Sequence, residues 1–193
     1  MIRFKLTSQS WAKQLLVVLL TVCFFSACNN DDVQSTYSTH QAYFYYPRVL
    51  TTQPLYAALT GPGQYCAISL SASNLIFQST TNSLSVPITA VSGYQRFQCI
   101  NGFIVGQSNI PDMTTMALPI LAFDRACPNC YVNDVITRPL TLKENGRAYC
   151  DRCRRTYDLN NLGLIIDGAK GDLNLFRYHI SYNGENIMVI KNQ

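Results

Sequence analysis

The chain carries two pairs of closely spaced cysteines in its second half. Cys127 and Cys130 form one C-x-x-C pair, and Cys150 and Cys153 form another, separated from the first by 19 residues. Each pair can turn two thiolates toward one ion, and the overall spacing matches that of zinc ribbons. The pattern therefore predicts one metal centre with four thiolate ligands. Such ligands suit structural zinc, a single iron or an iron–sulfur cluster such as [2Fe–2S].

Disulfides are the alternative use of these four cysteines. In an exported protein each C-x-x-C pair can close on itself, although such small loops are strained and labile. Bonds between the two pairs are also allowed. Spacing and compartment together favour the metal centre over disulfides or free thiols.

Export is indicated by the first 27 residues. A positively charged start is followed by the apolar run 14–25 and by small residues before Cys28. This order is typical of a secretory signal, and the run is shorter than the about 20 residues that span a bilayer. An uncleaved anchor helix is the alternative. The stretch FSAC resembles the lipobox of bacterial lipoproteins, which implies that Cys28 becomes the lipidated first residue of the mature protein.

The remaining chain predicts a tether and one domain. Residues 28–41 are polar and aperiodic and are interpreted as a flexible tether, and residues 42–193 as a single β domain. Removal of residues 1–27 takes away three positive charges, so the formal charge falls from +4 to +1, from 12 Lys and Arg and 11 Asp and Glu. This balance gives no indication of nucleic-acid binding.

The domain is predicted to be all-β, as a sandwich or small antiparallel barrel. Short apolar or β-branched runs alternate with turn residues, and no amphipathic helix of normal length is found. The runs cover residues 41–50, 54–59, 65–70, 75–78, 84–89, 97–105, 118–123, 132–142, 147–150, 164–166, 173–181 and 186–190. Asn-Gly pairs at 101–102, 145–146 and 183–184 predict hairpin turns. Cys66 and Cys99 lie in separate runs and are interpreted as a disulfide or as two buried thiols.

The flanks of the cysteine pairs resemble Rieske iron–sulfur proteins. LAFDRACPNC resembles the first ligand loop of that family, YCDRCRRTYDLNNLG the second, and GDLNLFRYHISYNGENIMVI the closing strands. The similarity covers about residues 118–190, with a metal-loop subdomain at about 118–163 that is also similar to rubredoxins and zinc ribbons. It implies a Rieske-like β fold in which two loops bring four ligands together.

The departures from that family fall on the ligands. Cys127 and Cys150 match its two cysteines, but Asn129 and Cys153 stand where its two histidines should be, and Cys130 is an additional thiol. The only histidines, His40 and His179, lie outside both loops. A cluster with two Cys and two His ligands is therefore not expected, and the proton-coupled chemistry of the family is not carried over.

Two functions follow as hypotheses. The first is electron transfer by a lipid-anchored protein of the cell envelope, through an iron centre and with a redox or envelope protein as partner. The second is a structural zinc site in a binding or assembly module. No catalytic motif is found, so the sequence leaves open whether the protein is an enzyme and indicates at most an electron-transfer component. Arg152, Arg154 and Arg155 near the second pair are interpreted as solvated loop residues.

Overall fold

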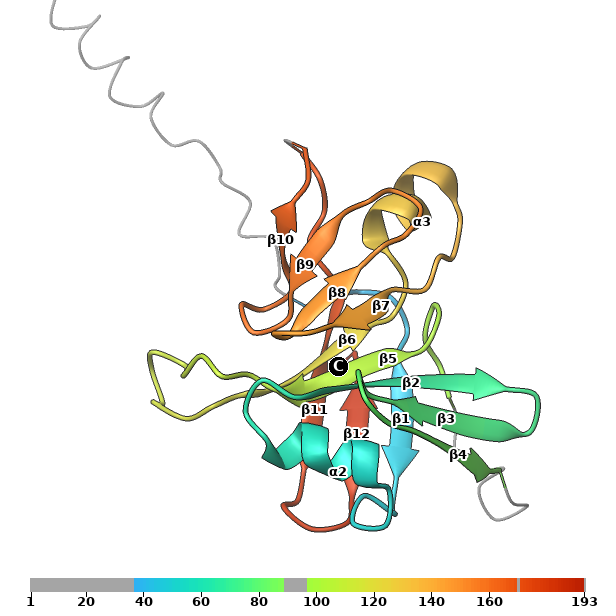
Figure 1. Ribbon diagram of the computed structural model, residues 1–193, viewed down its shortest axis with the longest axis vertical. Coiled ribbons are helices and arrows are strands. Elements are labelled where there is room, and N and C mark those ends of the chain that lie inside the picture. The colour runs from blue at the N-terminus through green and yellow to red at the C-terminus, as the bar shows by residue number, and fades with distance from the viewer. Residues whose placement is uncertain (1–36, 89–96, 170, 193) are drawn as a thin grey trace, which may run out of the picture. The chain divides into compact units, whose positions relative to one another are not determined.

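A computed structural model describes residues 37–88, 97–169 and 171–192. Residues 1–27, which were predicted to be a secretory signal, and Cys28 lie outside these residues. The chain from Thr36 to Gln193 forms one compact unit, which is mostly β, as expected (Figure 1). In the described part of the chain, neither helix has the length and apolar character needed to cross a bilayer.

The larger of two sheets has eight antiparallel strands in the order β1-β12-β11-β6-β5-β2-β3-β4. It curls, so that β1, β11 and β12 run across the direction of β2 and β3 (Figure 1). Its strands are β1 (Tyr43–Tyr46), β2 (Tyr65–Ser71), β3 (Asn74–Gln78), β4 (Ser83–Pro87), β5 (Phe103–Gln107), β6 (Ile120–Asp124), β11 (Arg177–Tyr182) and β12 (Met188–Lys191).

The smaller sheet lies in sequence between β6 and β11 and carries the second cysteine pair. Its four antiparallel strands have the order β10-β9-β8-β7. They are β7 (Thr141–Lys143), β8 (Arg147–Tyr149), β9 (Thr156–Asp158) and β10 (Leu164–Asp167). Asn160 fixes this sheet against the larger one, because its Oδ1 accepts hydrogen bonds from the Tyr65 hydroxyl and the Asn109 N–H, both at 3.1 Å.

Two hydrophobic clusters lie on opposite faces of the larger sheet. Successive side chains of a strand point to opposite faces, and in β5 Phe103 and Val105 join one cluster while Ile104 joins the other. The first cluster packs against α2 (Gln53–Thr60). The second cluster extends into the smaller sheet and contains three of the four paired cysteines. The metal-loop region therefore shares its core with the main sheet.

In the residues that the structure describes, two short helices replace predicted β runs. The run at 54–59 is α2, eight residues long, with Pro54 in its first turn and buried side chains on one face. The start of the run at 132–142 belongs to α3 (Pro128–Asp134), and only Thr141 and Leu142 of that run lie in a strand, β7. A helix of only about two helical turns is too short for its periodicity to be distinguished from a plain apolar run in the sequence.

Two of the three predicted Asn-Gly hairpins are present. Asn145-Gly146 joins β7 to β8, and Asn183-Gly184 joins β11 to β12. The prediction for Asn101-Gly102 was wrong. This segment is a bend before β5, held by the buried carboxylate of Asp124, which accepts the backbone N–H groups of Ile100 and Asn101 at 2.8 and 3.1 Å.

The start of the domain lies earlier than predicted. Tyr37 stacks on His179 with ring centroids 3.7 Å apart, and the Ser38 N–H donates to the Arg177 carbonyl at 2.8 Å. The His40 ring meets the edge of Phe176 at 4.8 Å. Residues 37–41 therefore pack on the β domain instead of belonging to a flexible tether.

Candidate metal centre

Each cysteine pair sits on a tight backbone turn at one end of the smaller sheet. Cys127 is the residue that precedes α3, and Cys130 lies in the first turn of that helix. Cys150 follows β8, and Cys153 lies in the turn that leads to β9. The second turn is closed by two backbone hydrogen bonds of 3.0 Å, from Cys150 N–H to the Arg155 carbonyl and from Arg154 N–H to the Cys150 carbonyl.

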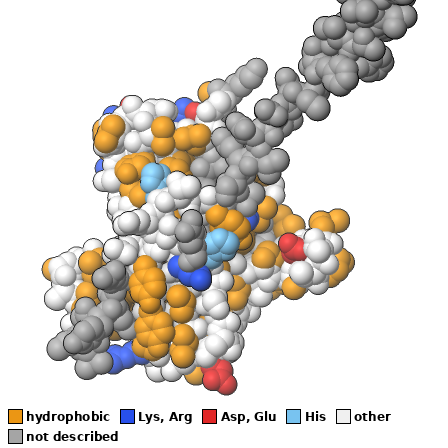
Figure 2. All heavy atoms as spheres, turned by 180° about the vertical axis from the view of Figure 1, so that it is seen from behind, with side chains coloured by type: hydrophobic (Ala, Val, Ile, Leu, Met, Phe, Trp, Pro, Cys, Tyr) orange, Lys and Arg blue, Asp and Glu red, His pale blue; other side chains and the backbone are white. Residues whose placement is uncertain are grey.

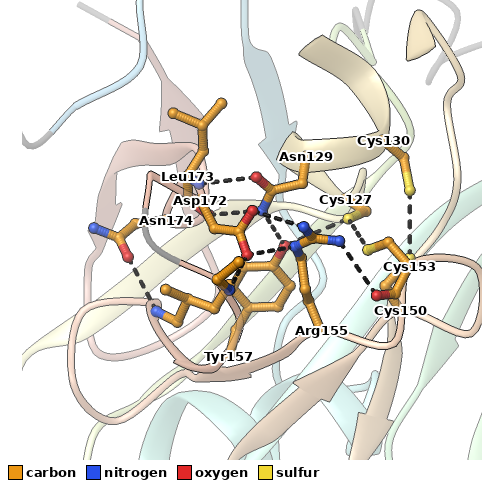
Figure 3. Close-up of polar contacts among 12 residues, drawn as sticks. Cys127, Asn129, Cys130, Cys150, Cys153, Arg155, Tyr157, Asp172, Leu173 and Asn174 are labelled. Atoms are coloured by element: carbon orange, nitrogen blue, oxygen red, sulfur yellow. Dashed lines mark hydrogen bonds and ion pairs between the residues drawn. The ribbon is translucent and has the colours of Figure 1, made fainter. Parts of the chain in front are cut away.

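The four sulfur atoms converge. All four Sγ atoms lie within 4.8 Å of one another. Across the two turns, the Sγ atoms of Cys127 and Cys153 are 3.4 Å apart, and the Sγ atoms of Cys130 and Cys150 are 3.7 Å apart (Figure 3). In a tetrahedral site with a Zn–S distance of about 2.3 Å, the sulfurs lie about 3.8 Å from one another. The cysteines that the sequence predicted as ligands thus stand where one ion can bind all four.

A binuclear cluster fits this arrangement less well than a single ion. In a [2Fe–2S] centre two thiolates bind each iron and two sulfides bridge the irons. Thiolates on different irons are consequently further apart than thiolates on one ion. To hold such a cluster, the Sγ atoms would have to move further apart than the 4.8 Å within which they now lie. Zinc and mononuclear iron share the tetrahedral thiolate geometry and are not distinguished by it.

The four thiols differ in exposure and in pKa, because their burial and hydrogen bonds differ. Cys127, Cys130 and Cys150 are buried, and Cys153 is partly exposed. Burial raises the pKa of Cys127 to about 11, although the Tyr157 hydroxyl and the Cys130 N–H oppose it. Burial also acts on Cys153, but the Arg155 N–H and the neighbouring thiols outweigh it and lower its pKa to about 7. Backbone N–H groups thus already point at sulfur on both turns.

A buried hydrogen-bond chain connects the centre to the segment before β11. The Asn129 side chain accepts the Leu173 N–H at 2.9 Å and donates to the Leu173 carbonyl at 3.0 Å. This fixes the orientation of the amide, whose NH2 also donates to the Tyr157 hydroxyl at 2.9 Å. The Tyr157 hydroxyl also lies 3.4 Å from Cys127 Sγ, and it donates its proton there when Cys127 is a thiolate.

Asn129 therefore has a role that its sequence position did not reveal. It was noted as the residue that stands where a histidine ligand was expected, but it lies outside the group of four sulfurs. Its side chain positions Tyr157 instead, with a backbone partner 44 residues away. The prediction that a strand begins at Leu173 was wrong, because β11 begins at Arg177. The backbone of Leu173 is hydrogen-bonded to the Asn129 side chain instead.

Arginines form a second layer around the cysteine turns. Arg155 makes a two-pronged, partly buried ion pair with Asp172, at 2.6 and 2.7 Å, and also donates to the Cys153 carbonyl at 3.3 Å (Figure 3). The interpretation of Arg155 as a solvated loop residue was therefore wrong. Arg152 and Arg154 are exposed, as expected, and Arg152 pairs with Asp134 at 3.4 Å.

The other candidate residues lie apart from this centre. Cys66 is buried in β2 and Cys99 is partly buried before β5, and both are free thiols in this structure. Cys99 Sγ accepts the Gly102 N–H at 2.9 Å. Burial raises the pKa of each thiol to about 12, which leaves both in the unreactive protonated form.

The four cysteines form a closed site that could hold one metal ion. Three of its four sulfurs are buried, and all four residues are cysteines, so a bound ion would keep no open position for a substrate. Comparisons with protein-family models, with curated proteins and with solved structures found no match to this chain.

Proposed function

We propose that this protein is a lipid-anchored β domain of the cell envelope, stabilised by one tetrahedral four-thiolate metal ion. The observation that carries the proposal is the convergence of four sulfurs within 4.8 Å from two separate turns. An ion bound there would join α3 to the turn between β8 and β9. Zinc has no redox chemistry, so with zinc the domain acts as a structural or binding module.

Electron transfer through a single iron is the second candidate. The partly exposed Cys153 supports it, because it leads from the buried sulfurs to the surface. The hydrogen bond from Tyr157 to Cys127 also supports it, since hydrogen bonds to ligand sulfur tune the reduction potential of iron. The likeness of both ligand loops to Rieske proteins favours a redox role, whereas the replacement of both histidines favours zinc.

Metal analysis tests the proposal and separates its two forms. The chain from residue 28, with Cys28→Ser, would be purified without oxygen and analysed for zinc, iron and acid-labile sulfide. One zinc in a colourless protein supports the structural site, and one iron with visible absorbance supports electron transfer. Two irons with labile sulfide, or no metal together with no free thiols among the four cysteines, would contradict the proposal.

Cys153→Ser is predicted to lower metal content and thermal stability together, because one of four ligands is lost. Metal per chain and the unfolding midpoint would be measured on the same sample. Cys99→Ser is the matched control, since it makes the same change at a thiol outside the centre. Unchanged metal binding in Cys153→Ser would remove this residue from the site.

A further inference from the structure

The sulfurs of the cysteine cluster approach each other across the two turns. The Sγ atoms of Cys127 and Cys153 are 3.4 Å apart, and those of Cys130 and Cys150 are 3.7 Å apart. Each contact joins one cysteine of the first pair to one cysteine of the second, and each cysteine is used once. A disulfide bond is about 2.05 Å long, so each couple would close after a movement of about 1.4–1.7 Å. Both disulfides can therefore form together at this site.

The four thiols are not equally accessible to a reagent in solution. Cys127, Cys130 and Cys150 are buried, whereas Cys153 is partly exposed. Its neighbours in sequence, on both sides, are exposed as well. A molecule that approaches from solution therefore meets Cys153 first, with Cys127 as the second thiol 3.4 Å away. An accessible cysteine beside a second thiol is the arrangement found where cysteines undergo reversible oxidation.

No other side chain is placed to keep an ion in the site after thiolates are oxidised. Within the residues that the structure describes, the group that could hold a metal consists of the four cysteines alone. Histidine side chains reach the surface on the rear face of the molecule (Figure 2). Their rings make other contacts, since His40 meets Phe176 and His179 stacks on Tyr37. The thiolate is the metal ligand, so oxidation of one couple leaves only two ligands for an ion.

We propose that Cys153 is the site at which an external low-molecular-weight disulfide reacts with the centre, and that this oxidation closes two bonds across the turns. The bonds are Cys127–Cys153 and Cys130–Cys150, and their formation releases the ion. The release of an ion rests on the proposed metal site. The supply of disulfides rests on the proposed location in the cell envelope, where disulfides form and persist.

The reaction consists of two successive thiol–disulfide exchanges for each bond. The thiolate of Cys153 attacks one sulfur of the external disulfide, forms a mixed disulfide and displaces one thiolate. Cys127 then attacks the Sγ atom of Cys153, forms the bond across the turns and displaces the second thiolate. Two protein thiolates are thus oxidised, and one external disulfide is reduced to two thiolates. Cys130 and Cys150 consume a second external disulfide in the same way.

The bonds across the turns would connect the elements that the ion connects. Each bond joins the start of α3 to the turn between β8 and β9. The bonded residues are 26 and 20 positions apart, whereas a bond within one pair joins residues three positions apart. A disulfide that closes a longer loop restricts the unfolded chain more. Oxidised protein without metal should therefore unfold roughly 5–10 °C above reduced protein without metal.

Peptide mapping tests the pairing on the chain from residue 28 with Cys28→Ser. The metal-loaded protein would be treated with glutathione disulfide, quenched with N-ethylmaleimide and digested with trypsin. Trypsin leaves both cysteines of the first pair on the peptide 126–143 and separates the second pair into the peptides 148–152 and 153–154. The expected product joins the first peptide to both of the others. A bond within the first peptide, together with a bond between the other two, would overturn the proposal.

Two double variants test which couples close. Cys130→Ser with Cys150→Ser keeps Cys127 and Cys153, whose sulfurs are 3.4 Å apart. Cys127→Ser with Cys150→Ser keeps Cys130 and Cys153 and is the matched control, since it also retains one thiol on each turn and the exposed cysteine. The first variant should form its disulfide roughly tenfold faster than the control, because its sulfurs are better placed. Equal rates would overturn the assignment of the couples.

Limiting iodoacetamide tests the entry point on the metal-loaded protein itself. The label should appear first on the peptide 153–154, since Cys153 is the exposed thiol of the four. Cys66 and Cys99 lie outside the centre and should stay unlabelled, which shows that the protein remains folded. A label that appears first on the peptide 126–143 or 148–152 would overturn the assignment of Cys153.

Metal released into a chromophoric chelator, measured on the same samples, separates this inference from the metal site. The expected result is the release of one ion together with the bonds across the turns. A metal-loaded protein that keeps its ion and its thiols in excess glutathione disulfide would overturn the inference and leave the metal site intact. A reduced protein that holds no ion but closes both bonds across the turns would count against the metal site alone.

Discussion

Asn129 and Tyr157 form the most informative contact at the scale of single residues. Asn129 donates to the Tyr157 hydroxyl, which lies 3.4 Å from Cys127 Sγ and donates to that sulfur when it is a thiolate. A hydrogen bond to a charged thiolate is stronger than one between neutral groups. Because Tyr157 is fully buried, no water is at hand to replace it. The amide of Asn129, which lies outside the four sulfurs, therefore orients the hydroxyl that contacts Cys127.

Tyr157→Phe is predicted to keep the fold but weaken metal binding by roughly 10–100-fold, the usual effect of losing a partner of a ligand. A competition titration with a chromophoric chelator would measure the change. Tyr182→Phe is the matched control, because its hydroxyl donates to the exposed Glu185 carbonyl at 2.9 Å, outside the centre. Equal metal affinity in the two variants would show that the bond to Cys127 has no influence on the ion.

Short elements hold the site, and α3 is the clearest example. It supplies one cysteine before its first turn and another within it, and its end is closed by a residue in the left-handed conformation. The cost of that conformation for a residue with a side chain is about 1–2 kcal/mol. The strained position at the end of the helix therefore also carries its most exposed apolar side chain.

Val135→Asn is predicted to raise the free energy of unfolding of the metal-loaded protein by about 1 kcal/mol, because asparagine tolerates this backbone conformation. Urea unfolding would measure it. Val132→Asn is the control on the same helix, and it should lower stability slightly, since it replaces a partly packed valine within the helix. A loss of stability in Val135→Asn as well would mean that Val135 makes contacts that outweigh its strain.

Short sequence patterns predicted the features that depend only on residues close together in the chain. The C-x-x-C pairs predicted the cluster of four cysteines, and the Asn-Gly pairs predicted the hairpin turns at Asn145-Gly146 and Asn183-Gly184. The turn at Asn101-Gly102 was misjudged because its fate depends on Asp124, more than 20 residues later in the chain. The part played by Asn129 was missed for the same reason, as its partner Leu173 is distant in sequence.

At the scale of the whole molecule, the larger sheet separates two cores. The first lies between the sheet and α2 and contains none of the four paired cysteines. The second contains Cys127, Cys130 and Cys150 together with side chains of β2, β5 and β6. The four-cysteine cluster is thus built into one core and separated from the other by a layer of backbone. The mostly β character of the domain was predictable, but the shared second core was not, since it joins distant segments.

Metal removal is predicted to loosen the second core and leave the first in place. After chelation, amide protons of residues 125–175 should exchange faster, while those of β3 and β12 keep their protection. Hydrogen exchange followed by mass spectrometry would show the pattern. Equal loss of protection in both regions would mean that the two cores unfold as one unit. Unchanged exchange everywhere would mean that the ion contributes little to folding.

X-ray absorption at the edge of the bound metal tests the central claim, four thiolates on one ion, most directly. The result expected is a single shell of four sulfurs at about 2.3 Å, with no metal neighbour. A second metal in the shell beyond, or nitrogen and oxygen ligands in place of two of the sulfurs, would contradict it.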